Sequence, residues 1–229
     1  MKPLFPLIFL ALAGCGAAPQ GYVPTPVAKV EPVNTDVASG EALMPMRVGS
    51  RWTYEMRTER LQGGVSAGSQ TAVAVYRVVA AKGNDYTLFL EADGNKLDAT
   101  DWRVTPEGLY QITSGSERIP TAPPQPLALL PMKVGNKFTW EGKAAMPDGK
   151  VSRGTAEGEV LAEQTVDTGM GPMSAIPVKI RMSFPSGKSE STSWYRPDVG
   201  MVRYRQTTTG NNGLSVVLTL SLTTPPNRS

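Results

Sequence analysis

The segment Ile176-Pro177-Val178-Lys179-Ile180-Arg181-Met182-Ser183-Phe184 alternates apolar and polar side chains with a period of two residues. In an extended chain, the apolar side chains from Ile176 to Phe184 point to one face, and Lys179, Arg181 and Ser183 point to the other. The same period runs through 214–222 and 86–90. The pattern predicts antiparallel strands that have one buried and one solvated face.

Short segments rich in Gly, Asn and Asp lie between such stretches and indicate tight turns. They are Asp93-Gly94-Asn95, Pro147-Asp148-Gly149-Lys150, Pro185-Ser186-Gly187-Lys188 and Gly210-Asn211-Asn212-Gly213. These residue types supply the positive φ that hairpins require, and no stretch after residue 15 has a sustained apolar stripe of helical period. We therefore predict an all-β fold, a curved antiparallel sheet or partial barrel of about ten or eleven strands.

An internal repeat divides the chain into two similar halves. Pro45–Glu55 (PMRVGSRWTYE) matches Pro131–Glu141 (PMKVGNKFTWE) with conservative differences only. A second pair follows, in which Trp102 and Pro106-Glu107-Gly108-Leu109 correspond to Trp194 and Pro197–Met201. We expect a first β half over 42–119, a Pro-rich connector over 120–130, a second β half over 131–224 and a tail over 225–229.

The amino terminus has the features of an export signal. Lys2 precedes the apolar run Leu4–Leu12, which is too short to span a bilayer as a helix. Leu12-Ala13-Gly14-Cys15 resembles the lipobox of bacterial lipoproteins, in which the cysteine receives a diacylglycerol and becomes the first residue. We expect 1–14 to be a lipoprotein signal peptide, Cys15 to carry the diacylglycerol and palmitate chains, and 15–41 to be a Pro-rich tether. The alternative is an ordinary signal peptide with a chance cysteine at its boundary.

The lipobox resemblance also implies a location. Gly16 follows the cysteine, where retention in the inner membrane typically uses Asp. The expectation is a lipid-anchored protein of the cell envelope, in the outer membrane and facing the periplasm if the host is diderm. The membrane, reached through the anchor, is then the first expected partner.

Composition excludes several classes of function. The 229 residues include no histidine and one cysteine, and the formal net charge is only +3. His-based triads, the usual His/Cys zinc sites and non-specific nucleic-acid binding are therefore not expected, and we predict neither a cofactor nor a metal. Gly64-Val65-Ser66-Ala67-Gly68 fits the G-x-S-x-G string of α/β hydrolases, but without a histidine we interpret it as a hairpin loop.

Two groups of side chains are candidates for a site. The acids Asp98, Asp101, Glu107 and Asp198 lie near the two tryptophan signatures and suggest either a carbohydrate-acting enzyme or hydrogen-bonded turns. The aromatic residues Trp52, Tyr54, Phe138 and Trp140 form a candidate apolar face, which either packs in the core or lines a concave surface for an apolar ligand. Val178 is not assigned to this candidate face.

Trp194–Tyr204 (WYRPDVGMVRY) resembles a W-Y-x-P-x-V-G-x-V-R-Y signature of uncharacterised bacterial lipoproteins of the TapB-like type. Pro131–Trp140 looks like the start signature of the same families. These families are similar in outline to LolA-like envelope carriers, and this resemblance implies a curved antiparallel sheet around a lipid cavity. LolA-like carriers also have covering helices, for which this sequence shows no pattern.

Three functions remain open from the sequence. The leading hypothesis is a lipid-anchored envelope protein with a non-catalytic β domain for binding or scaffolding, whose partner is an apolar ligand or an envelope protein. The alternative is a carrier of a lipid or other apolar ligand in a concave sheet. The third is the carbohydrate-acting enzyme.

Overall fold

The computed structural model describes residues 30–33, 37–145 and 151–226. Cys15, the signal peptide, most of the tether and the turn predicted at 147–150 lie outside the described residues. Within them, the chain is almost entirely β structure. The elements are α1 (Gly40–Leu43), β1 (Arg51–Gln62), β2 (Val65–Lys82), β3 (Asp85–Ala92), β4 (Asn95–Thr105), β5 (Gly108–Ser114), β6 (Ile119–Leu129), β7 (Lys137–Ala145), β8 (Val151–Val160), β9 (Gln164–Thr168), β10 (Gly171–Phe184), β11 (Gly187–Arg196), β12 (Gly200–Gly210) and β13 (Leu214–Thr224).

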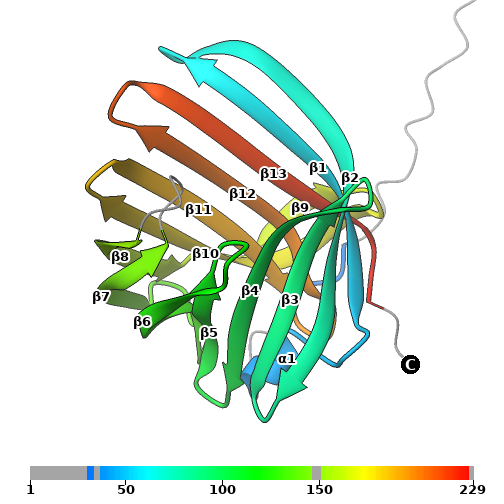
Figure 1. Cartoon of the computed structure of the whole chain (residues 1–229). Helices are drawn as coiled ribbons and strands as arrows, with labels where there is room; N and C mark the ends of the chain where they lie inside the picture. Colours follow the sequence, from blue (N-terminus) through cyan, green and yellow to red (C-terminus); the bar gives the residue numbers. More distant parts are fainter. Residues whose placement is uncertain (1–29, 34–36, 146–150, 227–229) are drawn as a thin grey trace, which may run out of the picture.

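The strands form an antiparallel barrel (Figure 1). Neighbours in sequence pair with each other around the ring, and β1 also pairs with β13. The ring closes at β10, because this strand pairs with β8 on one side and with β11 on the other. The predicted all-β antiparallel fold is confirmed, and the sheet closes on itself with twelve strands in the ring and β9 as a thirteenth.

The predicted number of strands, about ten or eleven, is lower than the thirteen observed, because some strands lack large apolar side chains. In β8, the buried positions are Gly154, Ala156, Gly158 and Val160, and the first three have a methyl group at most. The ring of Phe138 lies directly over Gly158, where an added Cβ would come 2.0 Å from that ring. A strand whose inward residues are this small shows no hydrophobic alternation, although it is as buried as its neighbours.

The Pro-rich segment predicted as a connector forms strand β6 instead. Its prolines at 120, 123, 124 and 126 have no N–H group to donate to a neighbouring strand. Pairing of β6 with β7 is accordingly reduced to Ala122 opposite Lys143. The indole N–H of Trp140 adds a side-chain bond across this seam by donating to the carbonyl oxygen of Pro123 at 2.9 Å.

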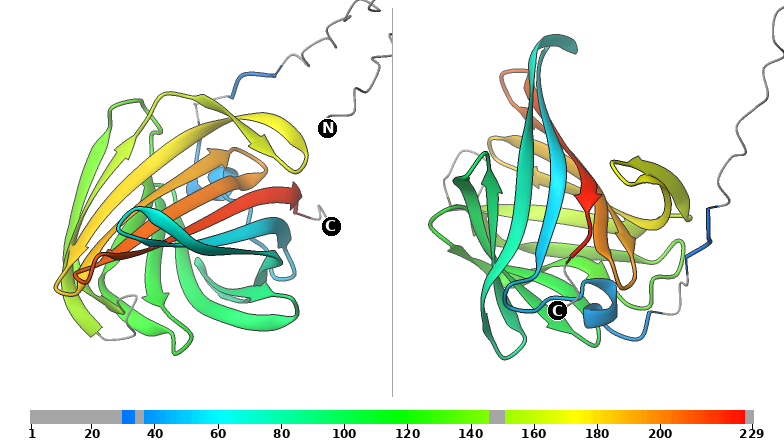
Figure 2. Two further views of the ribbon diagram at one scale, coloured as in Figure 1. Left: turned by 90° about the horizontal axis from the view of Figure 1, so that it is seen from above. Right: turned by 90° about the vertical axis from the view of Figure 1, so that its right-hand side faces the viewer.

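Strand β9 lies outside the ring. It pairs with the first part of β10, Gly171–Ala175, and the β9–β10 hairpin folds beside β12 and β13 (Figure 2). The indole N–H of Trp194 donates to Gln164 Oε1 at 2.9 Å, and the N–H of Gly169 donates to the Leu222 carbonyl at 2.8 Å. These bonds hold the hairpin against the barrel.

One end of the barrel is closed by the chain that precedes β1. Helix α1 has four residues and packs between the β4–β5 and β11–β12 turns, where the N–H of Asp198 donates to the Ala42 carbonyl at 2.8 Å. Leu43, Met44 and Met46 are almost fully buried there. In the described part of the chain, no helix has the length and apolar character needed to cross a bilayer.

The two repeat signatures meet at this closed end. Trp52 donates its indole N–H to the Val199 carbonyl at 2.7 Å, and the Tyr54 hydroxyl donates to the Met201 carbonyl at 2.8 Å. Gly200 lies between these acceptors with φ of 100°, and an added Cβ would come 2.9 Å from the Trp52 indole nitrogen. The matched segments 47–50 and 133–136 make the same turn, with a bond from the fourth N–H to the first carbonyl in each.

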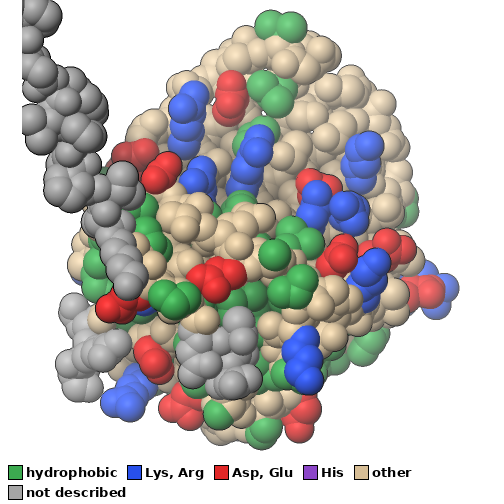
Figure 3. Space-filling view, turned by 180° about the vertical axis from the view of Figure 1, so that it is seen from behind, with side chains coloured by type: hydrophobic (Ala, Val, Ile, Leu, Met, Phe, Trp, Pro, Cys, Tyr) green, Lys and Arg blue, Asp and Glu red, His purple; other side chains and the backbone are tan. Residues whose placement is uncertain are grey.

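The outer face of the barrel is charged and mixed in sign. Seen from behind, lysine and arginine side chains are interspersed with aspartate and glutamate (Figure 3). On β10 and β11, Lys179 and Arg181 both pair with Glu190. These contacts lower the pKa of Glu190. The outer surface therefore carries charges of both signs, in agreement with the small net charge of +3.

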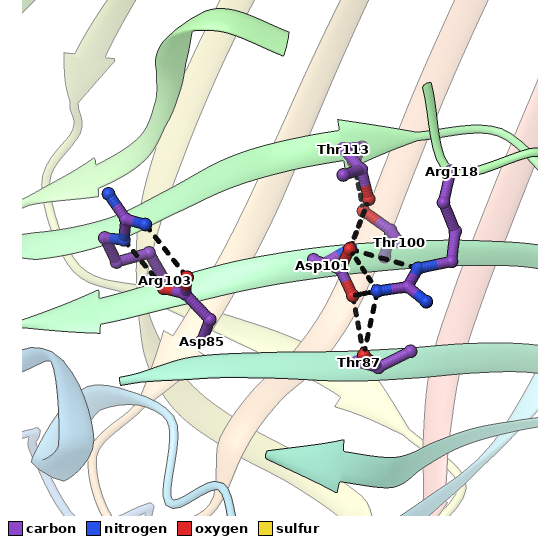
Figure 4. Close-up of polar contacts among 7 residues, drawn as sticks. All are labelled: Asp85, Thr87, Thr100, Asp101, Arg103, Thr113 and Arg118. Carbon is purple, nitrogen blue, oxygen red and sulfur yellow. Dashed lines mark hydrogen bonds and ion pairs between the residues drawn. The ribbon is translucent and has the colours of Figure 1, made fainter. Parts of the chain in front are cut away.

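A denser polar cluster lies on the outer face of β3, β4 and β5 (Figure 4). The guanidinium of Arg118, from the β5–β6 turn, donates to both carboxylate oxygens of Asp101, at 2.8 and 2.7 Å. The hydroxyls of Thr87 and Thr113 donate to the same carboxylate at 2.6 and 3.0 Å. The Asp101 side chain is only 9% exposed, so this cluster fastens the β5–β6 turn to the sheet with a nearly buried charge.

Arg118→Ala is expected to destabilise the fold by about 2 kcal/mol, because it leaves the Asp101 carboxylate buried without its cation. The matched control is Arg103→Ala, which removes the neighbouring ion pair to Asp85, where both side chains are substantially exposed. That change should cost at most about 1 kcal/mol. Urea unfolding followed by circular dichroism measures the loss of unfolding free energy in both variants. Equal losses would contradict the prediction that the burial of Asp101 makes its ion pair the more important one.

Candidate functional site

The interior of the barrel contains a cavity of about 550 Å³. It lies on the side away from α1 and reaches Phe184 next to the β10–β11 turn and Ser116 and Glu117 in the exposed β5–β6 turn. The volume falls within the range of small-molecule sites in proteins. The barrel is thus packed at its α1 end and hollow toward the other.

The cavity wall has an apolar portion. It includes Leu90, Leu127, Ile180, Met182, Phe184 and Leu218. Three of these residues are the inward-facing positions of β10, the strand whose alternation predicted the fold. Ile180 belongs to the packed core, and Met182 and Phe184 pack against it while partly exposed, so this part of the apolar face of β10 lies where the core borders the cavity.

The rest of the wall carries hydroxyl and amide groups. On β11 and β12 they belong to Ser189, Ser191, Ser193, Gln206 and Thr208, and on β4, β5 and β6 to Thr100, Gln111 and Gln125. The Gln206 amide donates to Ser189 Oγ at 3.0 Å, and Ser189 Oγ lies 3.3 Å from Thr208 Oγ1. The cavity therefore offers apolar surface and hydrogen-bonding groups side by side.

Asp98 places a carboxylate at this cavity. The side chain is half-buried on β4, and its Oδ1 accepts the N–H of Ala99 at 2.9 Å. Burial raises the pKa of Asp98, while the Ala99 N–H and the charge of Lys96 act in the opposite direction. Among the described residues of the lining, Glu117 is the other acid, and it is exposed.

Three tyrosines also border the cavity. They are Tyr76, Tyr195 and Tyr204. Burial raises the pKa of Tyr195 to about 12, although a hydrogen bond with Ser193 acts in the opposite direction. Burial also raises the pKa of Tyr76 and of Tyr204. All three phenols are therefore neutral at physiological pH and act as hydrogen-bonding groups.

The candidate apolar face lies elsewhere. Trp52 and Tyr54 are fully buried at the closed end, and Trp140 is nearly so beside β6. Phe138 packs over Gly158. None of the four is among the residues that line the cavity, so the structure places them in the packed part of the barrel.

The four candidate acids do not converge on one site. Asp98 lines the cavity, whereas Asp101 lies on the opposite face of β4 in its pair with Arg118. Glu107 is exposed in the β4–β5 turn, where a hydrogen bond with Thr105 lowers its pKa. Asp198 has φ of 63° in the β11–β12 turn. The paired-carboxylate hypothesis for these residues is therefore not supported, because only Asp98 faces the cavity.

The G-x-S-x-G string forms the predicted hairpin. Gly63 and Gly64 make the β1–β2 turn with positive φ, and Ser66 is exposed at the start of β2. A nucleophile elbow requires a strand followed by a helix, and β2 continues instead as a strand to Lys82. Cys15, the predicted lipidation site, lies outside the described residues.

Sequence reasoning missed most of the residues that line the cavity. Ser189, Ser191 and Ser193 recur with a period of two, which is the spacing of one strand face. Hydrophobic alternation does not find such residues, because it assumes that the inward face of a strand is apolar and packed. The period of two in these serines was the sequence signal for a polar inward face on β11.

Comparison with known proteins identifies structures but no family. No family model matches the chain, and no curated protein matches its sequence. A lipoprotein candidate of Parabacteroides distasonis ATCC 8503 aligns with 13% identity and a TM-score of 0.41, over 78% of this chain and 97% of its own. An exported-protein candidate with a YmcC-like fold from Bacteroides fragilis NCTC 9343 aligns with 14% identity and a TM-score of 0.37, over 80% and 98%.

The hypothetical lipoprotein YmcC of Escherichia coli K12 also aligns, with 10% identity and a TM-score of 0.36, over 72% of this chain and 83% of its own. These proteins are described as lipoproteins or as exported, and none is described as an enzyme.

Proposed function

We propose that this chain is a lipid-anchored protein of the bacterial cell envelope whose barrel binds a small amphiphilic ligand without converting it. The lipobox-like Leu12–Cys15 and the following Gly16 support the anchor and the outer-membrane location. The absence of histidine from the sequence supports a binding role over acid–base or nucleophilic catalysis.

The observation that carries the binding role is the cavity. A barrel made only to scaffold other proteins gains stability when its interior is filled, because each buried apolar side chain contributes about 1.5–3 kcal/mol. Here serine and threonine occupy inward positions such as Ser189, Ser191 and Thr208, next to Ile180 and Phe184. Small polar side chains at these positions leave about 550 Å³ for a ligand.

Ser191→Trp is expected to fill the cavity and abolish ligand binding. The test is native mass spectrometry of the chain purified from its own host, in which the wild-type protein should carry a bound mass beyond its covalent lipid. The matched control is Thr192→Trp, the adjacent position of β11 that does not line the cavity. Thr192→Trp should keep the bound mass.

Circular dichroism and thermal unfolding are the controls for correct folding of the two tryptophan variants. Wild-type protein that is repeatedly recovered without a bound mass would contradict the binding role. Equal bound mass in the wild-type and Ser191→Trp proteins would place the ligand outside the barrel.

A further inference from the structure

The charged side chains among the described residues that line the cavity are all acidic. Asp98 and Glu117 are acidic, and among the described residues that line the cavity there is no lysine or arginine. The basic residue nearest to Asp98 along β4 is Lys96, whose ammonium lies over the ring of Phe89, 4.9 Å from its centroid. Phe89 alternates with the inward-facing Leu88 and Leu90, so this ammonium is on the outer face.

Asp98 therefore has a half-buried carboxylate and no cationic partner. Within the described part of the chain, no lysine or arginine lies within ion-pair distance of it, in contrast to Asp101 three residues later. A carboxylate withdrawn from water is destabilised unless a cation or several donors approach it. The Ala99 N–H supplies one donor and the charge of Lys96 acts in the same direction without an ion pair, but burial still raises the pKa of Asp98.

Other polar groups of the cavity suit a hydrogen-bonding cation. Thr100 lies two residues from Asp98 on β4, Gln111 and Gln125 line the same cavity from β5 and β6, and their oxygens can accept from an ammonium. Ile180, Met182 and Phe184 supply apolar surface to the same cavity. An anionic head group would meet only like charge here.

We infer that the cavity selects cationic amphiphiles: an alkyl chain lies against the apolar side chains of β10, and its ammonium group is held by the carboxylate of Asp98. This inference rests on the proposed function and names the ligand class of the same cavity. It predicts that carboxylate and phosphate amphiphiles bind weakly, which separates this protein from carriers of fatty acids.

The test is isothermal titration calorimetry of ligand-stripped protein at pH 7.5 with four probes, each below its critical micelle concentration. Dodecylamine, dodecyl maltoside and dodecanoate share a chain and differ in head-group charge, and propylamine has the amine without the long chain. Dodecylamine is expected to bind at least about tenfold more tightly than dodecanoate. Propylamine is expected to bind much more weakly than dodecylamine, which separates an amphiphile from a free amine.

Asp98→Asn should weaken dodecylamine binding about tenfold and leave dodecyl maltoside unchanged. Asp93→Asn is the matched control, because it removes the same charge from the exposed β3–β4 turn, where asparagine tolerates the φ of 48°. It should change neither affinity.

The outcomes separate this inference from the proposed function. Equal affinities for the three dodecyl probes, or an Asp98→Asn variant that binds dodecylamine as the wild type does, would overturn the cationic selectivity and leave ligand binding intact. Tight binding of propylamine would overturn the amphiphile. Binding of none of the probes, together with no bound mass in protein from the host, would overturn the proposed function itself.

Discussion

Cys15→Ala is expected to abolish incorporation of radiolabelled palmitate and to move the chain from the membrane fraction to the soluble fraction. The thiol of Cys15 is the only one in the sequence, so no other cysteine can take the lipid. Each buried methylene contributes about 0.8 kcal/mol to membrane binding, and two or three acyl chains together give stable attachment. Losing them leaves a barrel whose outer face is charged and mixed in sign.

The measurement is fractionation of labelled cells, with the wild type and a Gly16→Ala variant as controls. Gly16→Ala keeps the cysteine and a small residue after it, so it should remain labelled and in the outer membrane. Gly16→Asp should remain labelled but stay in the inner membrane of a diderm host. Palmitate label retained by Cys15→Ala would refute the anchor.

Alkaline unfolding is expected to begin above about pH 10 and to be steep. Tyr54 and Tyr195 are 0% and 1% exposed, and burial raises the pKa of both phenols, that of Tyr195 to about 12. In the unfolded chain they ionise near pH 10. Because the folded pKa lies above the unfolded one, the stability from these groups is complete below pH 10 and is lost as pH rises toward 12.

The expected slope is about 1.4 kcal/mol per pH unit for each such tyrosine, or about 3 kcal/mol per pH unit for Tyr54 and Tyr195 together. Tyr76 and Tyr204, whose pKa burial also raises, add to this slope. Absorbance at 295 nm reports phenolate, and far-ultraviolet circular dichroism reports the sheet. The two signals should change together. Tyr195→Phe should lower the slope by about 1.4 kcal/mol per pH unit, since one of the four tyrosines with a raised pKa is gone. Titration of both phenols near pH 10 in a protein that stays folded would contradict their burial.

Local patterns predicted the strands whose inward side chains are large. The alternation over 176–184 falls within β10, and the hairpin signals at 93–95, 185–188 and 210–213 fall at turns or strand ends between paired strands. The Pro-rich segment 120–126 was misassigned because proline is rare in strands. In this barrel, β6 lies at a seam where its partner β7 needs few of its N–H groups.

The candidate site was harder to predict than the fold. Trp52, Tyr54, Phe138 and Trp140 are large and aromatic, and for that reason they fill space instead of leaving it. The sequence suggested Asp98 either for a carbohydrate-acting enzyme or for a hydrogen-bonded turn, because it lies near Trp102. Side chains an odd number of positions apart on a strand point to opposite faces. Asp98 and Asp101 are three residues apart, so only Asp98 faces the cavity.

The sequence by itself determined the antiparallel β class and the absence of histidine, and it predicted an export signal with lipid attachment at Cys15. Each of these depends on residue type or on a period of a few residues. Only the tertiary structure decided that β10 closes the ring, that α1 and the aromatic residues fill one end, and that a cavity with Asp98 on its wall occupies the other. Whether an inward face is packed or hollow depends on the summed volumes of side chains from strands far apart in the chain, and no local period records that sum.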